Sequence, residues 1–326
     1  IPESHSTCST LWFKFLTMSS SMISINSNNE WDTLKEVVLG TADHMNWPST
    51  KDFRSKWKNA PSGAVANTII YQTNKALEIF EEVLVAEGVN VLRPYEINYQ
   101  ERNGFGCYSP RDSILIVGNK AICSPMYFKD RMMEQEAILP HISSRSFITW
   151  PEDTEDMFDA ANVMRCNNDI LYLISSTGNF GGARWLQDVL GHEYRVTTIP
   201  KTVYHGSHLD STIVPLREGL VMLNSARVTE DTIPLFMKSW DKLWILEEDI
   251  IDIPTVTSPI STKWMALNLL SINPELVVCD PDQYILREKL NSVGIESIGV
   301  KLPHAKYLLG GHHCTTLDTI RTGFYN

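Results

Sequence analysis

The sequence contains no long apolar run and no excess of basic residues. No run of apolar residues approaches the roughly 20 residues that a helix needs to span a bilayer, so we expect no membrane partner. The net charge is −11, whereas binding to nucleic acid phosphates requires a basic face. We therefore expect no nucleic acid partner. The excess of negative charge either favours cationic ligands or forms a solvated surface.

Closely spaced cysteines are also missing. The six cysteines include no C-x-x-C pair; they are Cys8, Cys107, Cys123, Cys166, Cys279 and Cys314. Small secreted domains that depend on disulfides have a dense cysteine framework. The pattern therefore predicts reduced thiols and a cytoplasmic location.

The beginning of the chain lacks the pattern of a signal peptide. Residues 1–17 have one short apolar patch, at Leu11-Trp12-Phe13, and no basic stretch before it. Met18 and Met22 follow soon after, so we interpret this beginning as a tag or as upstream translation. We expect residues 1–27 to be a disordered extension and residues 28–326 to form one domain, because no linker rich in glycine, proline or serine divides them.

A weak repeat runs through the predicted domain. Apolar strand patterns begin at residues 112, 169, 219 and 275, a spacing of about 55 residues. Helical patterns lie between strands, at residues 71–87, 183–190, 232–240 and 283–293. This order predicts an α/β fold of about five modules in a closed ring, with a doubly wound sheet as the alternative. A long loop, residues 41–63, either covers a site or packs against it.

The stretch Gly310-Gly311-His312-His313-Cys314-Thr315-Thr316 is the first candidate for chemistry. A thiol is the most nucleophilic side chain at neutral pH, and glycines allow close approach of a ligand. A buried structural cysteine is the alternative reading.

Three acidic clusters could serve that thiol. His208 and Asp210 lie two residues apart, so they share one face of an extended segment and could act as an acid/base and a carboxylate. Asp159 lies in an acidic turn that either begins a helix or offers carboxylates to a cation. Arg111-Asp112 precedes a buried strand. Each cluster alone is more often structural.

Two other motifs give weaker signals. Gly178-Asn179-Phe180-Gly181-Gly182 matches neither a dinucleotide motif nor a P-loop with its lysine. The histidines near Cys314 and His208 match no familiar zinc spacing. We therefore expect no cofactor and no metal.

Three blocks of the sequence resemble the signature blocks of the amidinotransferases, whose type member is L-arginine:glycine amidinotransferase. They are Phe158-Asp159-Ala160-Ala161, Ser207-His208-Leu209-Asp210 and Gly311-His312-His313-Cys314-Thr315-Thr316. Weaker likeness extends over residues 31–40, 111–117, 179–186, 223–227 and 261–264. The resemblance implies a pentein-like fold, a five-module pseudo-symmetric α/β propeller.

The resemblance also implies a role for each matching residue. Cys314 would be the nucleophile, His208 the general acid and base, and Asp159 its carboxylate partner. Asp112 and Asp210 would hold a guanidinium, and Arg227 would take the α-carboxylate of the donor. Ser261 and Thr262 match hydroxyl positions near the donor and the cysteine, and a homodimer is common in the family.

The expected reaction moves the amidino group of L-arginine, through an amidino-cysteine, to an amine. The alternatives are an arginine deiminase-like hydrolase, in which water replaces the amine, and a silent arginine-binding paralogue. His205 and Ser207 stand where the type member has Asn and Met, which predicts a pocket for an acceptor larger or more polar than glycine. Natural-product amidinotransferases of the saxitoxin or cylindrospermopsin type fit this difference, and we favour a saxitoxin-type amino ketone over glycine. Asn162, where the type member has Asp, has no assigned effect.

Overall fold

The structure is a computed structural model that describes residues 25–58, 60–142, 147–148, 155–255 and 257–323. Its α-helices are α1 (Lys51–Lys56), α2 (Asn67–Ala86), α3 (Glu134–Ile138), α4 (Phe180–Leu190), α5 (Tyr284–Ser292) and α6 (Ala305–Leu308). Its strands are β1 (Thr33–Leu39), β2 (Asn46–Trp47), β3 (Gly63–Ala64), β4 (Asn90–Leu92), β5 (Ile114–Val117), β6 (Lys120–Cys123), β7 (Phe147–Ile148), β8 (Val163–Cys166), β9 (Asp169–Leu173), β10 (Arg195–Ile199), β11 (Ile213–Arg217), β12 (Leu220–Asn224), β13 (Asp241–Ile245), β14 (Leu270–Asn273), β15 (Leu276–Cys279), β16 (Glu296–Gly299) and β17 (Thr316–Thr322).

Within these residues the strands form five three-stranded sheets and one short pair, β2-β3. The three-stranded sheets are β17-β1-β4, β5-β6-β7, β8-β9-β10, β11-β12-β13 and β14-β15-β16. In each of them the middle strand pairs antiparallel with the first strand and parallel with the last. Five sheets with one pairing pattern confirm the predicted α/β class with five modules. They exclude the alternative of a single doubly wound sheet.

Tight turns and helical crossovers produce this pattern. Gly118, Asn167 and Gly219 have positive φ angles of 56°, 60° and 80° in the turns between first and middle strands, a conformation that glycine and asparagine adopt most readily. The third strand runs parallel to the middle one, so it requires a longer crossover. Helix α4 supplies this crossover between β9 and β10, and α5 supplies it between β15 and β16.

One predicted helix is wrong. In place of an α-helix, residues 232–240 contain the last residue of the 3-10 turn η7 (Glu230–Thr232) and the whole 3-10 turn η8 (Leu235–Met237). Pro234 lies between them, and proline has no N–H to donate and obstructs the preceding turn of a helix. The helical patterns at residues 71–87, 183–190 and 283–293 are confirmed as α2, α4 and α5.

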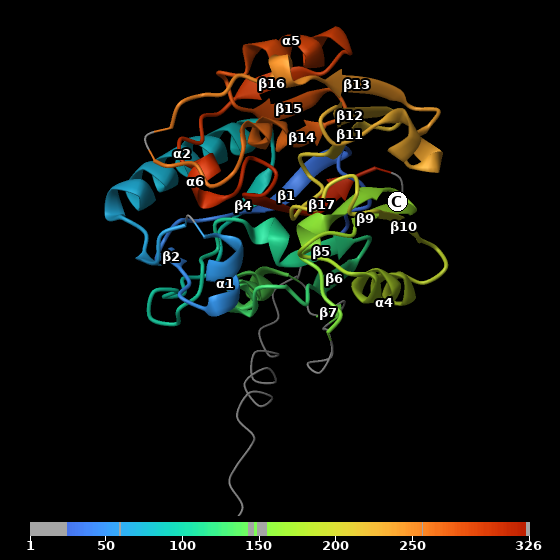
Figure 1. Ribbon diagram of the computed structural model, residues 1–326. Coiled ribbons are helices and arrows are strands. Elements are labelled where there is room, and N and C mark those ends of the chain that lie inside the picture. Colours follow the sequence, from blue (N-terminus) through green and yellow to red (C-terminus); the bar gives the residue numbers. More distant parts are fainter. Residues whose placement is uncertain (1–24, 59, 143–146, 149–154, 256, 324–326) are drawn as a thin grey trace, which may run out of the picture.

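Neighbouring modules contact one another in cyclic order. β17 contacts β5, the turn η6 (Ala160–Asn162) contacts β5, β8 contacts β11, β13 contacts α5, and β14 contacts β1. A closed ring of five modules requires this order. β1 pairs with β17 from Thr33↔Thr322 to Leu39↔Thr316, so one sheet joins the two ends of the domain. In Figure 1 this sheet lies near the middle, and α2, α4 and α5 lie at the periphery.

Residues 25–27 belong to the fold. Asn26 bridges to Ile320 and Ser27 to Gly118, and Ser27 Oγ donates a hydrogen bond to the buried Asp318 Oδ2 at 3.0 Å. The rest of the predicted extension, residues 1–24, lies outside the described residues.

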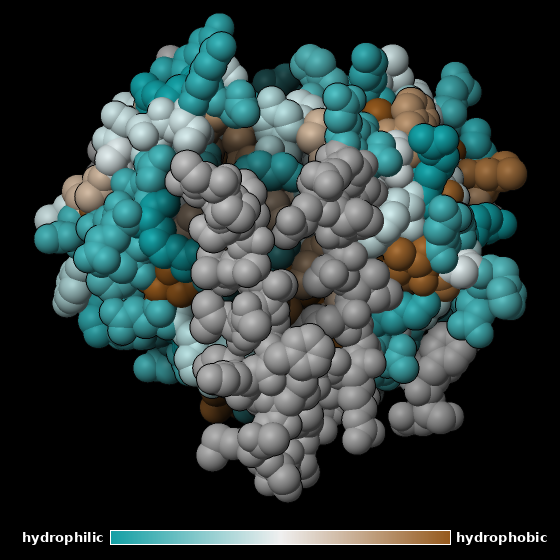
Figure 2. All heavy atoms as spheres, turned by 90° about the horizontal axis from the view of Figure 1, so that it is seen from below, coloured by the Kyte–Doolittle hydropathy of each residue, from teal (hydrophilic) through white to brown (hydrophobic). Residues whose placement is uncertain are grey.

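One face of the described surface is mostly polar (Figure 2). Figure 2 shows a face on which hydrophilic side chains predominate and apolar ones occur singly or in small groups, as on ordinary globular domains. Among the described residues, no helix is both long and apolar enough to cross a bilayer. The predicted long loop over residues 41–63 contains β2, α1 and the start of β3, with Trp47 and Phe53 buried against each other.

Candidate active site

Five loops, one from each module, converge on a cavity of about 430 Å³. Each loop precedes the strand that pairs antiparallel with the middle strand of its sheet, namely β5, β8, β11, β14 and β17. In that order the loops carry Asp112, Asp159, His208 with Asp210, Asn268, and Cys314. The site therefore uses an equivalent position of the repeat five times. All ten residues predicted for the site line this cavity.

Cys314 is buried and held by two partners. Its Sγ donates to Asp210 Oδ2 at 3.0 Å and accepts a hydrogen bond from Asn268 Nδ2 at 3.1 Å. Asn268 Oδ1 also accepts from the backbone N–H of Cys314 at 2.9 Å. Burial, followed by the charges of Asp210 and Asp112, raises the pKa of the Cys314 thiol well above its ordinary value. The free site therefore contains a thiol and not a thiolate.

The glycine before this loop permits the arrangement. A Cβ placed on Gly311 would lie 2.8 Å from Asn268 Oδ1 and 2.9 Å from Asn268 Cβ. Any larger residue would therefore displace Asn268 from Cys314. This contact explains the glycine that the sequence pattern placed beside the cysteine.

His208 lies between two carboxylates. Its Nε2 is 3.1 Å from Asp159 Oδ2, and its Nδ1 is 3.6 Å from Asp112 Oδ1. Burial lowers the pKa of His208, but Asp112 and Asp159 outweigh this effect, so that the pKa lies above its ordinary value. This shift favours the protonated form of His208, which can give a proton to a leaving group. Asp159 Oδ1 in turn accepts from the backbone N–H of Tyr127 at 3.2 Å, which fixes the carboxylate.

One oxygen of Asp112 accepts a hydrogen bond from the described residues and the other does not. Oδ2 accepts a hydrogen bond from Arg131 Nη1 at 2.8 Å, and Arg131 also makes two hydrogen bonds to Glu134, at 2.7 and 2.9 Å. Oδ1 of Asp112 is buried and accepts no hydrogen bond within the described structure. A buried carboxylate oxygen without a donor is costly, so it indicates a place where a ligand N–H binds.

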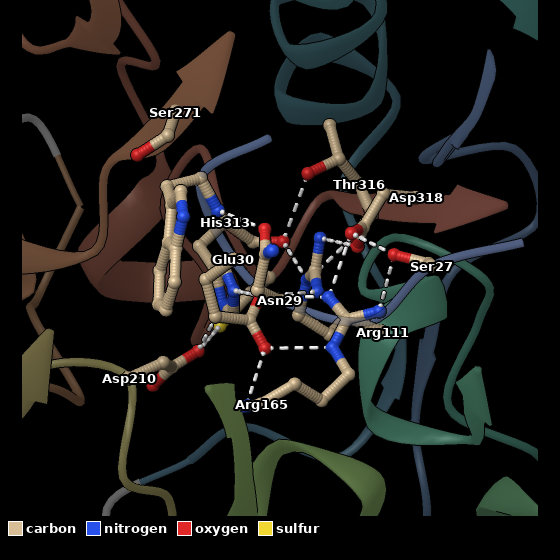
Figure 3. A network of polar contacts seen from close by, with 12 residues as sticks. Ser27, Asn29, Glu30, Arg111, Arg165, Asp210, Ser271, His313, Thr316 and Asp318 are labelled. Atoms are coloured by element: carbon tan, nitrogen blue, oxygen red, sulfur yellow. Dashed lines mark hydrogen bonds and ion pairs between the residues drawn. The ribbon is translucent and has the colours of Figure 1, made fainter. Parts of the chain in front are cut away.

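Asp210 stays ionised although it is buried. Burial raises its pKa, but the hydrogen bond and the charge of His313 outweigh burial and lower the pKa to about 2. His313 Nδ1 lies 3.1 Å from Asp210 Oδ2, the same oxygen that accepts from Cys314. Figure 3 shows Asp210 and His313 at the edge of a larger polar network.

Arg227 and two predicted hydroxyl residues lie in the outer part of the cavity. Arg227 Nη1 donates to Thr212 Oγ1 at 2.7 Å and to Ser211 Oγ at 3.0 Å, and its guanidinium stacks 3.7 Å over the ring of Tyr204. No carboxylate pairs with Arg227 among the described residues, so its charge is available to a substrate anion. Ser261 Oγ donates to the backbone carbonyl of Lys306 at 3.2 Å, and Thr262 lies next to it in the lining.

The lining residues that the sequence analysis did not name include Asn268, Arg131 and Lys56. Asn268 has no titratable group, although it occupies the module position that carries the site residues elsewhere. Arg131 lies in a helical turn without a motif. Lys56 ends α1 and contacts Ser176 Oγ, with Trp57, Tyr127 and Phe128 rings 5.6 to 5.7 Å from its ammonium. Burial lowers the pKa of Lys56 to about 8, against the opposing charge of Asp159.

The arrangement does not require a metal. Asp112, His208 and Cys314 present donor atoms within 4.8 Å of one another. However, His208 already contacts Asp159, and Cys314 already contacts Asp210 and Asn268. We assign the three groups to substrate chemistry, and the absence of a metal from the reaction stays a prediction.

Comparison with known proteins agrees with this geometry, although no family model matches the chain. The chain is 34% identical over 341 residues to inosamine-phosphate amidinotransferase 1 of Streptomyces glaucescens, across 92% of this chain and 97% of that protein. It is 28% identical over 353 residues to mitochondrial glycine amidinotransferase of Xenopus tropicalis, across 91% of this chain and 83% of that protein.

Solved structures show the same likeness. The inosamine-phosphate amidinotransferase of Streptomyces griseus superposes with a TM-score of 0.86 at 32% identity, covering 93% of this chain and 98% of that one. An amidinotransferase of the saxitoxin biosynthetic pathway from Microseira wollei gives 0.86 at 28% identity, with the same coverage. The N-terminal domain of a cyanobacterial arginine dihydrolase gives 0.66 at 14% identity, over 89% of this chain and 98% of that one, and so shares the fold alone. These likenesses confirm the predicted pentein-like class.

Proposed function

The chain belongs to the amidinotransferase family, and we propose that it transfers the amidino group of L-arginine through Cys314 to a primary amine. The buried Oδ1 of Asp112, which accepts no hydrogen bond from the described residues and has the His208 ring 3.6 Å away, carries this proposal. It is buried in a cavity that contains three carboxylates, a thiol and an imidazolium. A guanidinium would supply the missing donor together with a positive charge beside the carboxylates, which makes the hydrogen bond stronger than one from a neutral donor.

The guanidinium of arginine would bind between Asp112 and Asp210. Both carboxylates offer oxygens to planar N–H groups, in a geometry that suits paired, charge-assisted hydrogen bonds. Arg227 in the outer cavity would bind the α-carboxylate of the same molecule, with the hydroxyls of Ser261 and Thr262 nearby. The amidino carbon would then lie beside Cys314 Sγ, because Asp210 contacts both.

The first half-reaction breaks the bond between the amidino carbon and the side-chain nitrogen of arginine. Arginine binding to Asp210 competes for the oxygen that holds the Cys314 proton, and the added positive charge favours the thiolate. The sulfur attacks the amidino carbon while His208 gives its proton to the departing nitrogen, and ornithine leaves. The proton that Cys314 lost leaves with ornithine, whose side-chain amine departs as an ammonium ion, so His208 stays neutral. A cationic amidino-cysteine remains, and atoms and charge balance.

The second half-reaction reverses these steps with another amine. The acceptor attacks the amidino carbon, His208 takes its proton, and the carbon–sulfur bond breaks. The guanidino product leaves, and Cys314 takes up a proton. Because donor and acceptor use the same cavity in turn, the kinetics are of the ping-pong type.

We propose a natural-product amine larger than glycine as the acceptor, with a saxitoxin-type amino ketone as the favoured form. His205 and Ser207 line the cavity where the type member has Asn and Met, and a saxitoxin-pathway enzyme shares the fold closely. A second candidate is an aminocyclitol phosphate. The 34% identity to an inosamine-phosphate enzyme and the Lys56 ammonium in the cavity both favour it.

A panel of amines tests the acceptor. The protein is incubated with L-arginine and glycine, an amino ketone or an aminocyclitol phosphate, and products are identified by mass. A guanidino product with one of the two larger amines supports the proposal, while glycine as the best acceptor by a wide margin contradicts it. Arginine alone serves as the control, since citrulline and ammonia without an acceptor would indicate a hydrolase.

The cell compartment is a separate proposal. The five described cysteines, Cys107, Cys123, Cys166, Cys279 and Cys314, are all free and buried. Free thiols of this kind persist in a reducing environment, so we propose a cytoplasmic location.

A further inference from the structure

We propose that His313 is a positioning residue. As an imidazolium it forms ion pairs with both Glu30 and Asp210. It thereby orients Asp210 toward Cys314 and offsets the carboxylate charge beside the sulfur. The proposal rests on the amidino transfer through Cys314 described above. It gives a role to a buried histidine that this reaction otherwise leaves unused.

The geometry requires two protons on the His313 ring. Nδ1 lies 3.1 Å from Asp210 Oδ2, and Nε2 lies 3.3 Å from Glu30 Oε2. A neutral imidazole has one N–H and one lone pair, so one nitrogen would point a lone pair at a carboxylate oxygen. Only the charged form donates to both carboxylates.

Glu30 is held in the ionised form mainly by Arg165, and Asp210 by His313 together with His208 and Cys314. Burial opposes ionisation of Glu30, but Arg165 lowers its pKa below the ordinary range, with hydrogen bonds of 2.7 and 2.8 Å to the two Glu30 oxygens. Arg111 Nη1 lies 3.4 Å from the same carboxylate. Asp210 is ionised, as described above. His313 therefore faces negative charge on both sides.

The network behind His313 fixes the cysteine loop itself. Arg111 Nε donates to the backbone carbonyls of His313, at 2.9 Å, and Thr316, at 2.8 Å. Arg111 and Arg165 both pair with the buried Asp318, at 2.5 and 2.6 Å. Figure 3 shows these side chains meeting from the N-terminal segment, the loop before β5, β8 and β17. The backbone on both sides of Cys314 is thus anchored, and His313 cannot turn without breaking two ion pairs.

His313 changes the electrostatic environment of the Cys314 sulfur. Asp210 Oδ2 accepts from His313 Nδ1 and from Cys314 Sγ at the same time. Without a positive charge on the far side, the full charge of Asp210 would oppose a thiolate. With it, the pair is close to neutral, so the thiolate can form once arginine arrives. The charged and titratable groups that face His313 are Glu30, Asp210, Cys314 and, through the backbone carbonyl, Arg111.

The adjacent His312 provides a matched control. It is as buried as His313, but its Nε2 donates to the carbonyl of Val300 at 2.8 Å and its ring packs edge-on against Phe80 at 5.4 Å. Burial lowers the pKa of His312 to about 4, so the ring is neutral. The two histidines share a loop and differ in charge.

The first experiment compares His313→Gln with His312→Gln. The rate of Cys314 alkylation by iodoacetamide is measured against pH in the free protein, after circular dichroism has confirmed folding. We expect the profile of His313→Gln to move up by about one pH unit, which is about tenfold slower reaction at neutral pH, and that of His312→Gln to stay in place. An unchanged profile in folded His313→Gln protein overturns the proposal.

A second measurement needs no substitution at His313. In ¹⁵N-histidine-labelled His208→Asn protein, we expect one histidine to keep protons on both ring nitrogens at about pH 8. If no such histidine is present, the proposed charged His313 between Glu30 and Asp210 is wrong. Neither readout depends on turnover, so both can fail while amidino transfer holds. Conversely, if Cys314 is not the alkylated thiol in the wild type, the proposed function fails and this measurement still decides the charge of His313.

Discussion

The floor and the rim of the cavity differ in how their charged groups are stabilised, by buried ion pairs in the floor and by partial exposure to solvent at the rim. The floor is a buried network that does not line the cavity but contacts its lining residue Asp210 through His313. It consists of Glu30, Arg111, Arg165, His313 and Asp318, each held by an ion pair. The rim is made of Lys56, Tyr204, His205, Ser207 and Arg227, all at least partly exposed. Every charge of the floor is paired, so a substitution there leaves a buried charge without a partner and is costly. We therefore expect the floor, and with it the reaction of the donor, to stay the same among relatives. A partly solvated rim can change at low cost, so it is the place where acceptor choice can differ among relatives.

Removing a carboxylate next to the floor should have the largest effect. Asp112→Asn removes the negative charge and one hydrogen-bond acceptor that would bind the guanidinium. It also leaves Glu134 as the ion-pair partner of Arg131. We expect kcat/KM for L-arginine to fall by about 10³-fold, equivalent to about 4 kcal/mol. Steady-state ornithine release measures it.

The control for this variant is Asp169→Asn, which removes a carboxylate that pairs with the exposed Arg195 outside the cavity. Its activity should remain within about twofold of the wild type, as expected for a surface ion pair. Equal losses in the two variants would contradict a special role for Asp112.

The state of Cys314 should depend on the ligand. Burial and the charges of Asp210 and Asp112 raise the pKa of the free thiol, so its reaction with iodoacetamide should be slow at neutral pH and faster as the pH rises. An arginine analogue that leaves the sulfur accessible should accelerate alkylation by about tenfold or more, because its guanidinium favours the thiolate. Equal alkylation rates with and without the analogue would show that the charges of the carboxylates do not control the pKa of the Cys314 thiol.

Changing the rim should alter acceptor binding and leave the donor reaction intact. Lys56→Met keeps the length of the side chain and removes its charge. We expect KM for an aminocyclitol phosphate to rise by about tenfold and KM for a neutral amine to stay unchanged. Lys51→Met, at the exposed start of the same helix, is the control.

The pH dependence of the same binding gives a smaller effect. Burial lowers the pKa of Lys56 to about 8, so its positive charge is present below that pH and is lost as the pH rises through it. KM for the phosphate acceptor should therefore increase above about pH 8 in the wild type. A similar increase in Lys56→Met would assign the titration to another group.

The sequence predicted much of the site because the chemistry uses titratable side chains in short motifs. Cys314, His208, Asp159, Asp112 and Asp210 all reach one cavity, although as many as about 200 residues separate them. The repeat explains the convergence, since each loop precedes the same strand of its module. Their catalytic roles stay proposals.

The parts that were missed have physical reasons. Asn268 occupies the same module position as the acids but carries no charge, so residue type did not reveal it. The contribution of Lys56 depends on how α1 folds over the cavity, which no local pattern specifies. The helix predicted over residues 232–240 is wrong because the apolar spacing there is interrupted by the proline at 234.

Mass spectrometry of the protein with L-arginine and no acceptor tests the central claim most directly. We predict one equivalent of ornithine, a mass increase of one amidino group on Cys314, and loss of that group when an acceptor amine is added. Cys314→Ala should show neither ornithine nor adduct. Ornithine formed only in the presence of an acceptor, with Cys314 unmodified throughout, would contradict transfer through the cysteine.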